Sequence, residues 1–199
     1  MRTDPTASLL VERAAALAEK FHEGQKYGEF PYTVHVERVA RRLVTLGVAY
    51  EPLLAAALLH DTLEDTEATR DGLRDSLREV LHHDTQHLAT VTVDLVWAVT
   101  GEGSNRRERN KSIEQKILEV GRMAAILKAA DRIENVESCY ETKNPLIFMY
   151  GREYLPFREV LLRAPVRGRY VVDERDTTLD RAIAHLDRLM GYRPREMEK

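Results

Sequence analysis

The feature that most restricts the fold is an uninterrupted apolar segment, Leu53–Leu59, that runs directly into the dipeptide His60–Asp61. Because the segment is apolar on every side, it predicts a central buried helix rather than a helix at the surface. It is far too short to span a membrane. The chain is therefore expected to build a core around this helix and to place a polar pair at its end.

Apolar residues recur at helical spacing over most of the remaining chain. The pattern predicts helices at about residues 8–26, 33–46, 69–83, 85–99, 111–120, 123–140, 145–162 and 177–190. The valines of segment 85–99 would also suit a strand, and residues 100–110 predict a loop. We expect one all-α domain over residues 1–199, a bundle of about eight to ten helices. Its core would cover about 9–160, with a C-terminal helical extension at 165–192.

Charge and cysteine content narrow the function classes. Thirty basic and 33 acidic residues give a net charge of −3, so no general attraction to nucleic acid or to an anionic membrane is expected. The single cysteine, Cys139, excludes an intrachain disulfide and favours a reducing, cytoplasmic location. Cys139 is more simply a small filler in a helix than a nucleophile, because no histidine lies near it in sequence.

Polar residues at positions that the pattern predicts to be buried are the informative ones. His60 and Asp61 end the apolar helix, Asp131 sits in the apolar stretch 123–136, and His35 lies beside the apolar stripe of segment 33–46. Two buried carboxylates with two imidazoles require a shared cation, and these donor types suit a divalent metal ion. The absence of cysteine among them argues against a structural zinc site.

The context of the His60–Asp61 pair strengthens this interpretation. In H-D-T-L-E-D-T, Asp61, Glu64 and Asp65 are spaced to share one face of a continuing helix, where they would repel one another without a cation. Asp131 and Asn135 project together for the same reason. Exposure of the acidic helix end to water, or a surface ion pair of Asp131 with its neighbour Arg132, are the simpler alternatives.

Four motifs occur in a fixed order: H-x-G-Q from His22, P-Y-x-x-H from Pro31, A-A-L-L-H-D-T-L-E-D-T from Ala56, and K-A-A-D-R-I-E-N from Lys128. Together they resemble the HD hydrolase domain of RelA/SpoT-type alarmone hydrolases, and they are most similar to its small stand-alone members. The resemblance covers about residues 9–160. It implies an all-α enzyme that removes the 3′-pyrophosphate from guanosine tetra- or pentaphosphate, leaving GDP or GTP.

The resemblance also implies roles for individual residues. A manganese ion, or another divalent metal, would be bound by His35, His60, Asp61 and Asp131. Glu64 and Asp65 would activate water, while Asn135 and Tyr154 would lie near the nucleotide.

The phosphates of such a small-molecule nucleotide need cationic partners, because the protein is acidic overall. The expected phosphate contacts are Lys26, Arg106, Arg107, Arg109, Lys111 and Arg132. The charges clustered at 106–111 could equally be an exposed charge run.

The chain departs from the family pattern in two places. Residues 26–30, K-Y-G-E-F, replace a longer basic stretch whose arginine stacks on guanine, so a phosphohydrolase for another nucleotide, such as a deoxynucleotide or an NADPH-like phosphate, is one alternative. A non-catalytic binding module that retained the metal site is another. His82, His83 and His87 fall in an extra stretch and form either a second metal site or an exposed helix face.

Overall fold

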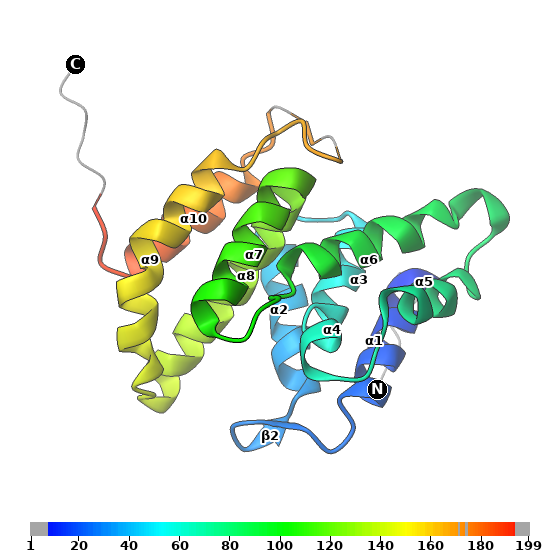
Figure 1. The fold of residues 1–199 in the computed structure, drawn as a ribbon, viewed down its shortest axis with the longest axis horizontal. Coiled ribbons are helices and arrows are strands. Elements are labelled where there is room, and N and C mark those ends of the chain that lie inside the picture. Colours follow the sequence, from blue (N-terminus) through cyan, green and yellow to red (C-terminus); the bar gives the residue numbers. More distant parts are fainter. Residues whose placement is uncertain (1–7, 171, 174, 194–199) are drawn as a thin grey trace.

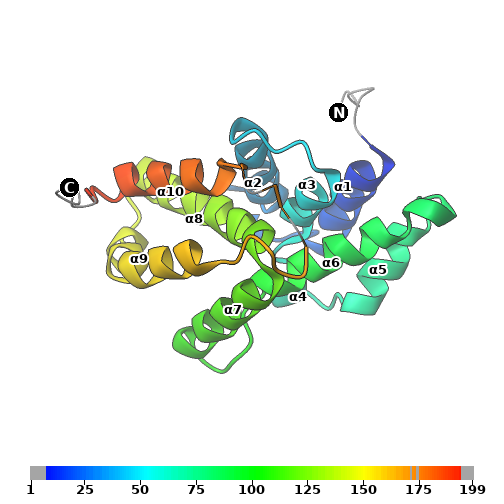
Figure 2. The same ribbon diagram turned by 90° about the horizontal axis from the view of Figure 1, so that it is seen from above.

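The computed structural model describes residues 8–170, 172–173 and 175–193, so both ends of the expected domain over 1–199 lie outside the described residues. Helices dominate it, and the all-α prediction is confirmed (Figure 1). Helices α1 and α5 lie toward one end of the molecule and α9 and α10 toward the other, with α2 and α8 between them (Figures 1 and 2). Within this described part, no helix is long and apolar enough to cross a membrane.

The elements follow in chain order. The first half contains α1 (Leu9–Phe21), β1 (Lys26–Tyr27), β2 (Phe30–Pro31), α2 (Thr33–Thr45), α3 (Glu51–Leu59), α4 (Thr62–Asp65), α5 (Arg70–Arg78) and α6 (His87–Val99), with a 3₁₀ turn, η1 (His83–Thr85), before α6. The second half contains α7 (Arg106–Val120), α8 (Arg122–Thr142), α9 (Leu146–Arg163) and α10 (Thr178–Leu189). The valine-rich segment 85–99 thus forms a helix, not a strand.

Helix α3 is the centre of the first half, as its all-apolar sequence predicts. It packs against α1, α2, α6 and α8. Its alanines allow these neighbours to approach closely, and Ala55, Ala56 and Ala57 are completely buried. The helix ends at Leu59, so the next two residues emerge at the junction of several helices.

Helix α8 is the axis of the second half. It packs against α2 and α3 on one side and against α9 and α10 on the other (Figure 2). The turn that leads into it depends on two glycines. Gly121 adopts a φ of 101°, and a Cβ atom at Gly168 would lie 2.4 Å from the carbonyl oxygen of Val120. The segment after α9 can therefore cross the start of α8 at close range.

Two local differences from the sequence expectations have clear physical reasons. Helix α7 begins at Arg106, inside the expected loop, because the Asn105 side chain caps it by accepting a hydrogen bond of 3.0 Å from the backbone N–H of Glu108. Residues 26–31, where the sequence predicts the end of the first helix and no strand, form a small antiparallel hairpin in which Lys26 pairs with Pro31. Gly28, with a φ of 60°, supplies its turn.

Candidate metal centre and its pocket

Three helices deliver the four predicted metal ligands to one place. His35 lies in the first turn of α2, His60 and Asp61 follow the end of α3, and Asp131 lies in the middle of α8. Asp61 also begins the short helix α4, since its carbonyl accepts the backbone N–H groups of Glu64 and Asp65. Because α2, α3 and α8 pack against one another, these side chains converge.

The distances define a compact polar cluster. His35 Nε2 lies 3.5 Å from both Asp61 Oδ2 and Asp131 Oδ1. His60 Nε2 lies 3.1 Å from Asp61 Oδ2 and 3.6 Å from Asp131 Oδ1. One donor atom from each of His35, His60 and Asp131 fits within 4.8 Å of the others, and all three residues are buried.

The imidazole of His60 is oriented by a backbone carbonyl. Its Nδ1 donates to the carbonyl oxygen of Ala57 at 2.8 Å, because a carbonyl can only accept. This fixes the proton on Nδ1 and turns Nε2 toward the carboxylates. Nε2 is completely buried and has no hydrogen-bond partner. A buried nitrogen without a partner, facing ionised carboxylates, is an arrangement that a divalent cation would satisfy.

The charges of the cluster also favour a cation. Burial raises the pKa of Asp131, but Lys128 and the two histidines outweigh it and hold that pKa well below its usual range. Asp61 is kept ionised in the same way, chiefly by His60. Burial lowers the pKa of His60, yet Asp61 and Asp131 raise it to about 10. The cluster thus attracts positive charge, whether a proton or a metal ion.

Tyr32 connects Asp61, a predicted ligand, to Asp65, a member of the acidic pair Glu64–Asp65. Its hydroxyl donates to Asp61 Oδ2 at 2.6 Å and lies 3.2 Å from Asp65 Oδ2. The ring of His22 stacks on Tyr32 with ring centroids 4.5 Å apart. Gln25 bonds to His22 and to the backbone carbonyl of Asp65. The H-x-G-Q and P-Y-x-x-H motifs therefore act as supports for the cluster.

Glu64 and Asp65 both line the pocket in front of the cluster, in different surroundings. Asp65 is an exposed residue whose carboxyl lies beside Tyr32, and partial desolvation of that carboxyl together with the charge of Asp61 raises its pKa. Glu64 accepts the backbone N–H of Gly101 at 2.9 Å and lies 3.8 Å from Arg109. Asp65 thus faces the ligand cluster, while Glu64 is held at the rim.

Four basic residues, called the basic wall below, line the same pocket as the acidic pair. Arg106 and Arg109 reach this pocket from the first turn of α7, and Lys128 and Arg132 reach it from α8. Lys128 Nζ lies 2.9 Å from Asp131 Oδ2. Arg106 makes a two-pronged ion pair with Glu153 of α9, at 2.6 and 2.9 Å. The pocket, of about 210 Å³, is therefore lined by acidic and basic side chains together.

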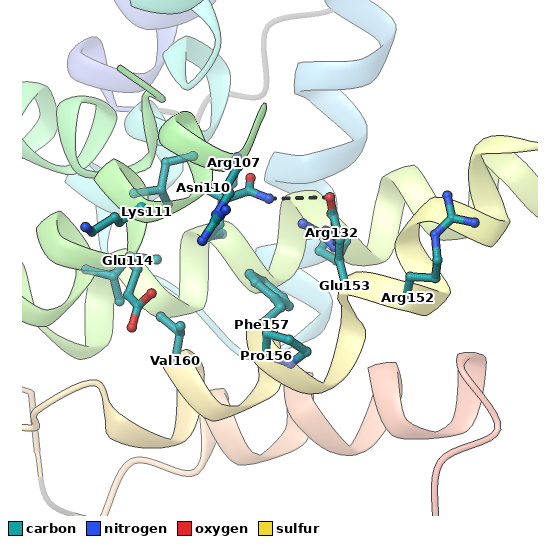
Figure 3. A pocket seen from close by; sticks show the side chains of 13 residues that line it. Arg107, Asn110, Lys111, Glu114, Arg132, Arg152, Glu153, Pro156, Phe157 and Val160 are labelled. Atoms are coloured by element: carbon teal, nitrogen blue, oxygen red, sulfur yellow. Dashed lines mark hydrogen bonds and ion pairs between the residues drawn. The ribbon is translucent and has the colours of Figure 1, made fainter. Parts of the chain in front are cut away.

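A second pocket, of about 440 Å³, opens between α7 and α9 over α8 (Figure 3). Arg107 and Lys111 line this pocket rather than the one at the cluster. The two pockets share Asn110, Ile113, Lys128 and Arg132. Its floor is apolar, with Phe157 and Val160 from α9. Apart from Lys26, the expected phosphate contacts are thus divided between two adjoining pockets.

Three of the predicted nucleotide contacts have distinct positions. Asn135 lies at the cluster, where its Nδ2 donates to Asp131 Oδ1 at 2.5 Å. Lys26 is exposed in the hairpin and lines a separate surface hollow beside α1. Tyr154 is buried against α10, where its hydroxyl bonds to Asp187. The structure does not bring Lys26 or Tyr154 to the pocket in front of the cluster.

Two tyrosines that sequence reasoning did not select line the pocket instead. Tyr27 stacks on His35, with ring centroids 4.6 Å apart, and its hydroxyl donates to Asn135 at 3.1 Å. Tyr150, one turn before Tyr154, lies 4.7 Å from the Arg132 guanidinium. Tyr27 belongs to K-Y-G-E-F, the segment that departs from the family pattern, so the sequence carried a signal for it. Whether Tyr150 or Tyr154 faces the pocket depends on the rotation of α9 about its axis.

The three imidazoles of His82, His83 and His87 are exposed around η1. His87 bonds to the carbonyl oxygen of Asp84. Among the described residues, the group close enough to hold an ion is that of His35, His60 and Asp131, and the three exposed histidines are not part of such a group.

Comparison with known proteins agrees with the motifs. The chain matches no family model. It is 32% identical over 136 residues to the guanosine-3′,5′-bis(diphosphate) 3′-pyrophosphohydrolase of Aquifex aeolicus, covering 65% of this chain and 18% of that protein. A probable enzyme of the same name from Mycoplasma pneumoniae is 30% identical over 148 residues, covering 67% of this chain and 19% of that protein. A GTP pyrophosphokinase of Streptomyces coelicolor is 32% identical over 132 residues, covering 64% of this chain and 14% of that protein.

A solved structure supports the fold over nearly the whole chain. It is described as a metazoan ortholog of SpoT that hydrolyzes ppGpp and plays a role in starvation responses. It aligns with a TM-score of 0.67 at 22% identity, covering 92% of this chain and 97% of that one. The chain spans less than a fifth of the length of the curated relatives it matches. The resemblance to RelA/SpoT-type hydrolase domains is therefore confirmed, and the activity is inferred below.

Proposed function

We propose that this chain is a manganese-dependent phosphohydrolase that removes the 3′-pyrophosphate from guanosine tetra- or pentaphosphate. The observation that carries the proposal is the cluster of His35, His60, Asp61 and Asp131 beside a basic wall. Relatives named for this activity support the substrate class. We place the reaction in the cytoplasm, within a single domain over residues 1–199.

The proposed ligands would hold a divalent ion through two imidazole nitrogens and two carboxylates. Such an ion lowers the pKa of water and acts as a Lewis acid on a phosphoryl oxygen. The Asp61 carboxylate is oriented for this by Tyr32, and the Asp131 carboxylate by Asn135 and Lys128. The substrate itself would meet the pocket's own side chains.

Asp65 is the residue we assign to accept the proton of the attacking water. Its raised pKa brings it closer to the range in which a carboxylate accepts protons efficiently near neutral pH. Its Oδ2 shares the Tyr32 hydroxyl with Asp61, which places it next to the ligand cluster. Glu64, tied to Gly101, would position the α6–α7 loop and Arg109 around the substrate.

Charge neutralisation falls to the basic wall. The leaving pyrophosphate and the remaining phosphates carry several negative charges, which Arg106, Arg109 and Arg132 would balance. Arg132 is held between aromatic rings, 4.7 Å from Tyr150 and 4.4 Å from Phe157, so its guanidinium is positioned in advance. Arg107 and Lys111, in the adjoining pocket, would meet only a substrate long enough to reach beyond the metal pocket.

The test is a product analysis with guanosine tetraphosphate. With manganese present, anion-exchange chromatography should detect GDP and pyrophosphate in equal amounts, and a chelator should abolish them. Asp65→Asn should lower kcat by about 10²- to 10⁴-fold, the usual contribution of a general base. Glu64→Gln is the matched control, and it should act mainly on KM. Equal loss of kcat in both variants would refute the assignment of Asp65.

A second candidate is hydrolysis of another phosphorylated nucleotide. The segment K-Y-G-E-F favours it, because this segment presents Tyr27 to the pocket and leaves Lys26 outside. A panel that includes deoxynucleoside triphosphates and NADPH, assayed with manganese, separates the two. If guanosine tetraphosphate stays intact while another nucleotide is cleaved, the primary proposal fails and the second replaces it.

A further inference from the structure

Helix α9 carries an apolar stripe on its solvent side. Phe148, Leu155 and Leu162 recur at intervals of seven residues, so they lie on one face of the helix. Their exposed fractions are 70%, 53% and 52%. An adjoining face of α9, with Tyr154 and Leu161, is buried. Three large apolar side chains in a row on one exposed helix face are typical of an interaction surface rather than of a free surface.

Two opposite charges complete this stripe. Arg152 and Glu159 are exposed and occupy the positions between the apolar residues, giving the order Phe148, Arg152, Leu155, Glu159, Leu162 on a single face. Neither Arg152 nor Glu159 makes an ion pair within the described part of the chain, whereas neighbouring Arg158 and Arg163 both do. The two charges are therefore available to a partner.

A second copy of α9 that runs in the opposite direction would present complementary residues to this face. Leu155 is the midpoint between Phe148 and Leu162, and it also lies beside the midpoint between Arg152 and Glu159. In an antiparallel pair of identical helices, a two-fold axis at Leu155 would therefore bring each Phe148 near a Leu162. The same axis would bring each Arg152 near a Glu159. A symmetric interface uses the same patch on both copies, and this patch meets that requirement.

We propose that the exposed face of α9 is the contact surface of a symmetric homodimer, in which two copies of α9 pack antiparallel about Leu155. The helix has 18 residues and is about 27 Å long, so one pair of helices buries an area at the low end of specific interfaces. The dimer is therefore weak, with a dissociation constant on the order of micromolar. The stripe is separate from the ligand cluster, so dimer formation does not depend on the proposed hydrolase activity.

Exchanging the charges of Arg152 and Glu159 gives a test that distinguishes damage to the fold from loss of contact between the two copies. In sedimentation velocity, the unaltered chain should shift from monomer to dimer as its concentration rises through the micromolar range. Arg152→Glu and Glu159→Arg should each remain monomeric, because like charges would then face each other. The double variant R152E/E159R should regain the dimer, and an equimolar mixture of the two single variants should form a mixed dimer.

Leu155→Glu, at the axis, should also remain monomeric, while an unchanged helical circular dichroism spectrum and melting temperature would show that it is folded. The proposal is overturned if the unaltered chain stays monomeric at about 0.5 mM. It is equally overturned if a dimer forms that is insensitive to Leu155→Glu, or if the double variant fails to recover what the single variants lose.

Discussion

Single atoms decide how the polar cluster is held together, and the Tyr32 hydroxyl is the clearest example. It donates to Asp61 Oδ2 at 2.6 Å and reaches Asp65 Oδ2 at 3.2 Å. Burial and the two carboxylates raise the pKa of Tyr32, so the hydroxyl stays protonated and remains a donor. Without the Tyr32 hydroxyl, the carboxylates of Asp61 and Asp65 would be free to rotate.

Tyr32→Phe should weaken manganese binding by about 10- to 100-fold, the usual effect of removing a group that orients a metal ligand. Isothermal titration calorimetry with manganese measures this directly. Tyr27→Phe is the matched control, because Tyr27 also stacks on a cluster histidine but its hydroxyl bonds to Asn135 rather than to a proposed ligand. Equal losses in the two variants would contradict a specific role for Tyr32.

The proposed ligands could be found from sequence because each is a polar residue in an apolar helical pattern. The residues that shape the pocket could not be found in this way. Arg107 and Arg109 are two positions apart on α7 and therefore point to different hollows, a difference visible only once the start of that helix is known. Likewise, whether Tyr150 or Tyr154 faces the pocket depends on how α9 packs on α8 and α10.

At the scale of elements, helix α3 holds the site by being buried on all sides. Leu59, its last residue, is completely buried and immediately precedes His60. Leu59→Ala should lower the free energy of unfolding by about 2 to 5 kcal/mol, because it removes buried methyl groups and leaves a cavity. Urea denaturation measures the change. Leu9→Ala, at an exposed position that begins α1, should cost no more than about 0.5 kcal/mol; a similar cost at both positions would contradict the central role of α3.

Helix α7 depends on its cap. Asn105 accepts the Glu108 N–H, while the Glu108 carboxylate accepts from the backbone and hydroxyl of Ser104. Asn105→Ala should destabilise the protein by about 1 kcal/mol, and Asn105→Ser should largely retain the stability because serine also caps helices. Thermal unfolding compares them. A loss in the serine variant as large as in the alanine variant would show that capping is not the reason.

The core helices could be predicted because their apolar periodicity is strong. The residues at which several helices begin or end could not. The expected helix over 69–83 ends at Arg78 in the structure, and the loop over 100–110 yields to α7 at Arg106. The cap at Asn105, with glutamate three residues later, is a sequence signal for that start. The hairpin at 26–31 has no such signal beyond Gly28, since strands of two residues are too short for a recognisable pattern.

At the scale of the whole molecule, Asp94 ties three separate segments together. This buried carboxylate of α6 accepts from Arg70 in α5 at 3.0 Å, and from Arg169 and Tyr170, which follow α9, at 2.9 and 2.8 Å. Burial raises the pKa of Asp94, but these three partners outweigh it and lower that pKa below its usual value. The C-terminal segment is thereby fastened to the first half of the molecule.

Because the folded state lowers the pKa of Asp94, its stabilising effect is complete above the unfolded pKa of about 4. The effect is lost as the pH falls through the lower, folded pKa. Asp94→Asn should therefore melt at a lower temperature than the unaltered protein at pH 7, and the difference should shrink at about pH 3. Scanning calorimetry at both values tests this. A difference that does not change with pH would show that charge on Asp94 is not responsible.

We propose that His35, His60, Asp61 and Asp131 form a metal centre. Anomalous diffraction at the manganese absorption edge, from crystals grown with manganese, tests it most directly. We predict one strong peak in contact with His35 Nε2, His60 Nε2 and a carboxylate oxygen of each aspartate, and the loss of that peak in Asp131→Asn crystals that retain the fold. A peak elsewhere, or no peak at these residues at saturating manganese, would show that they do not form a metal centre.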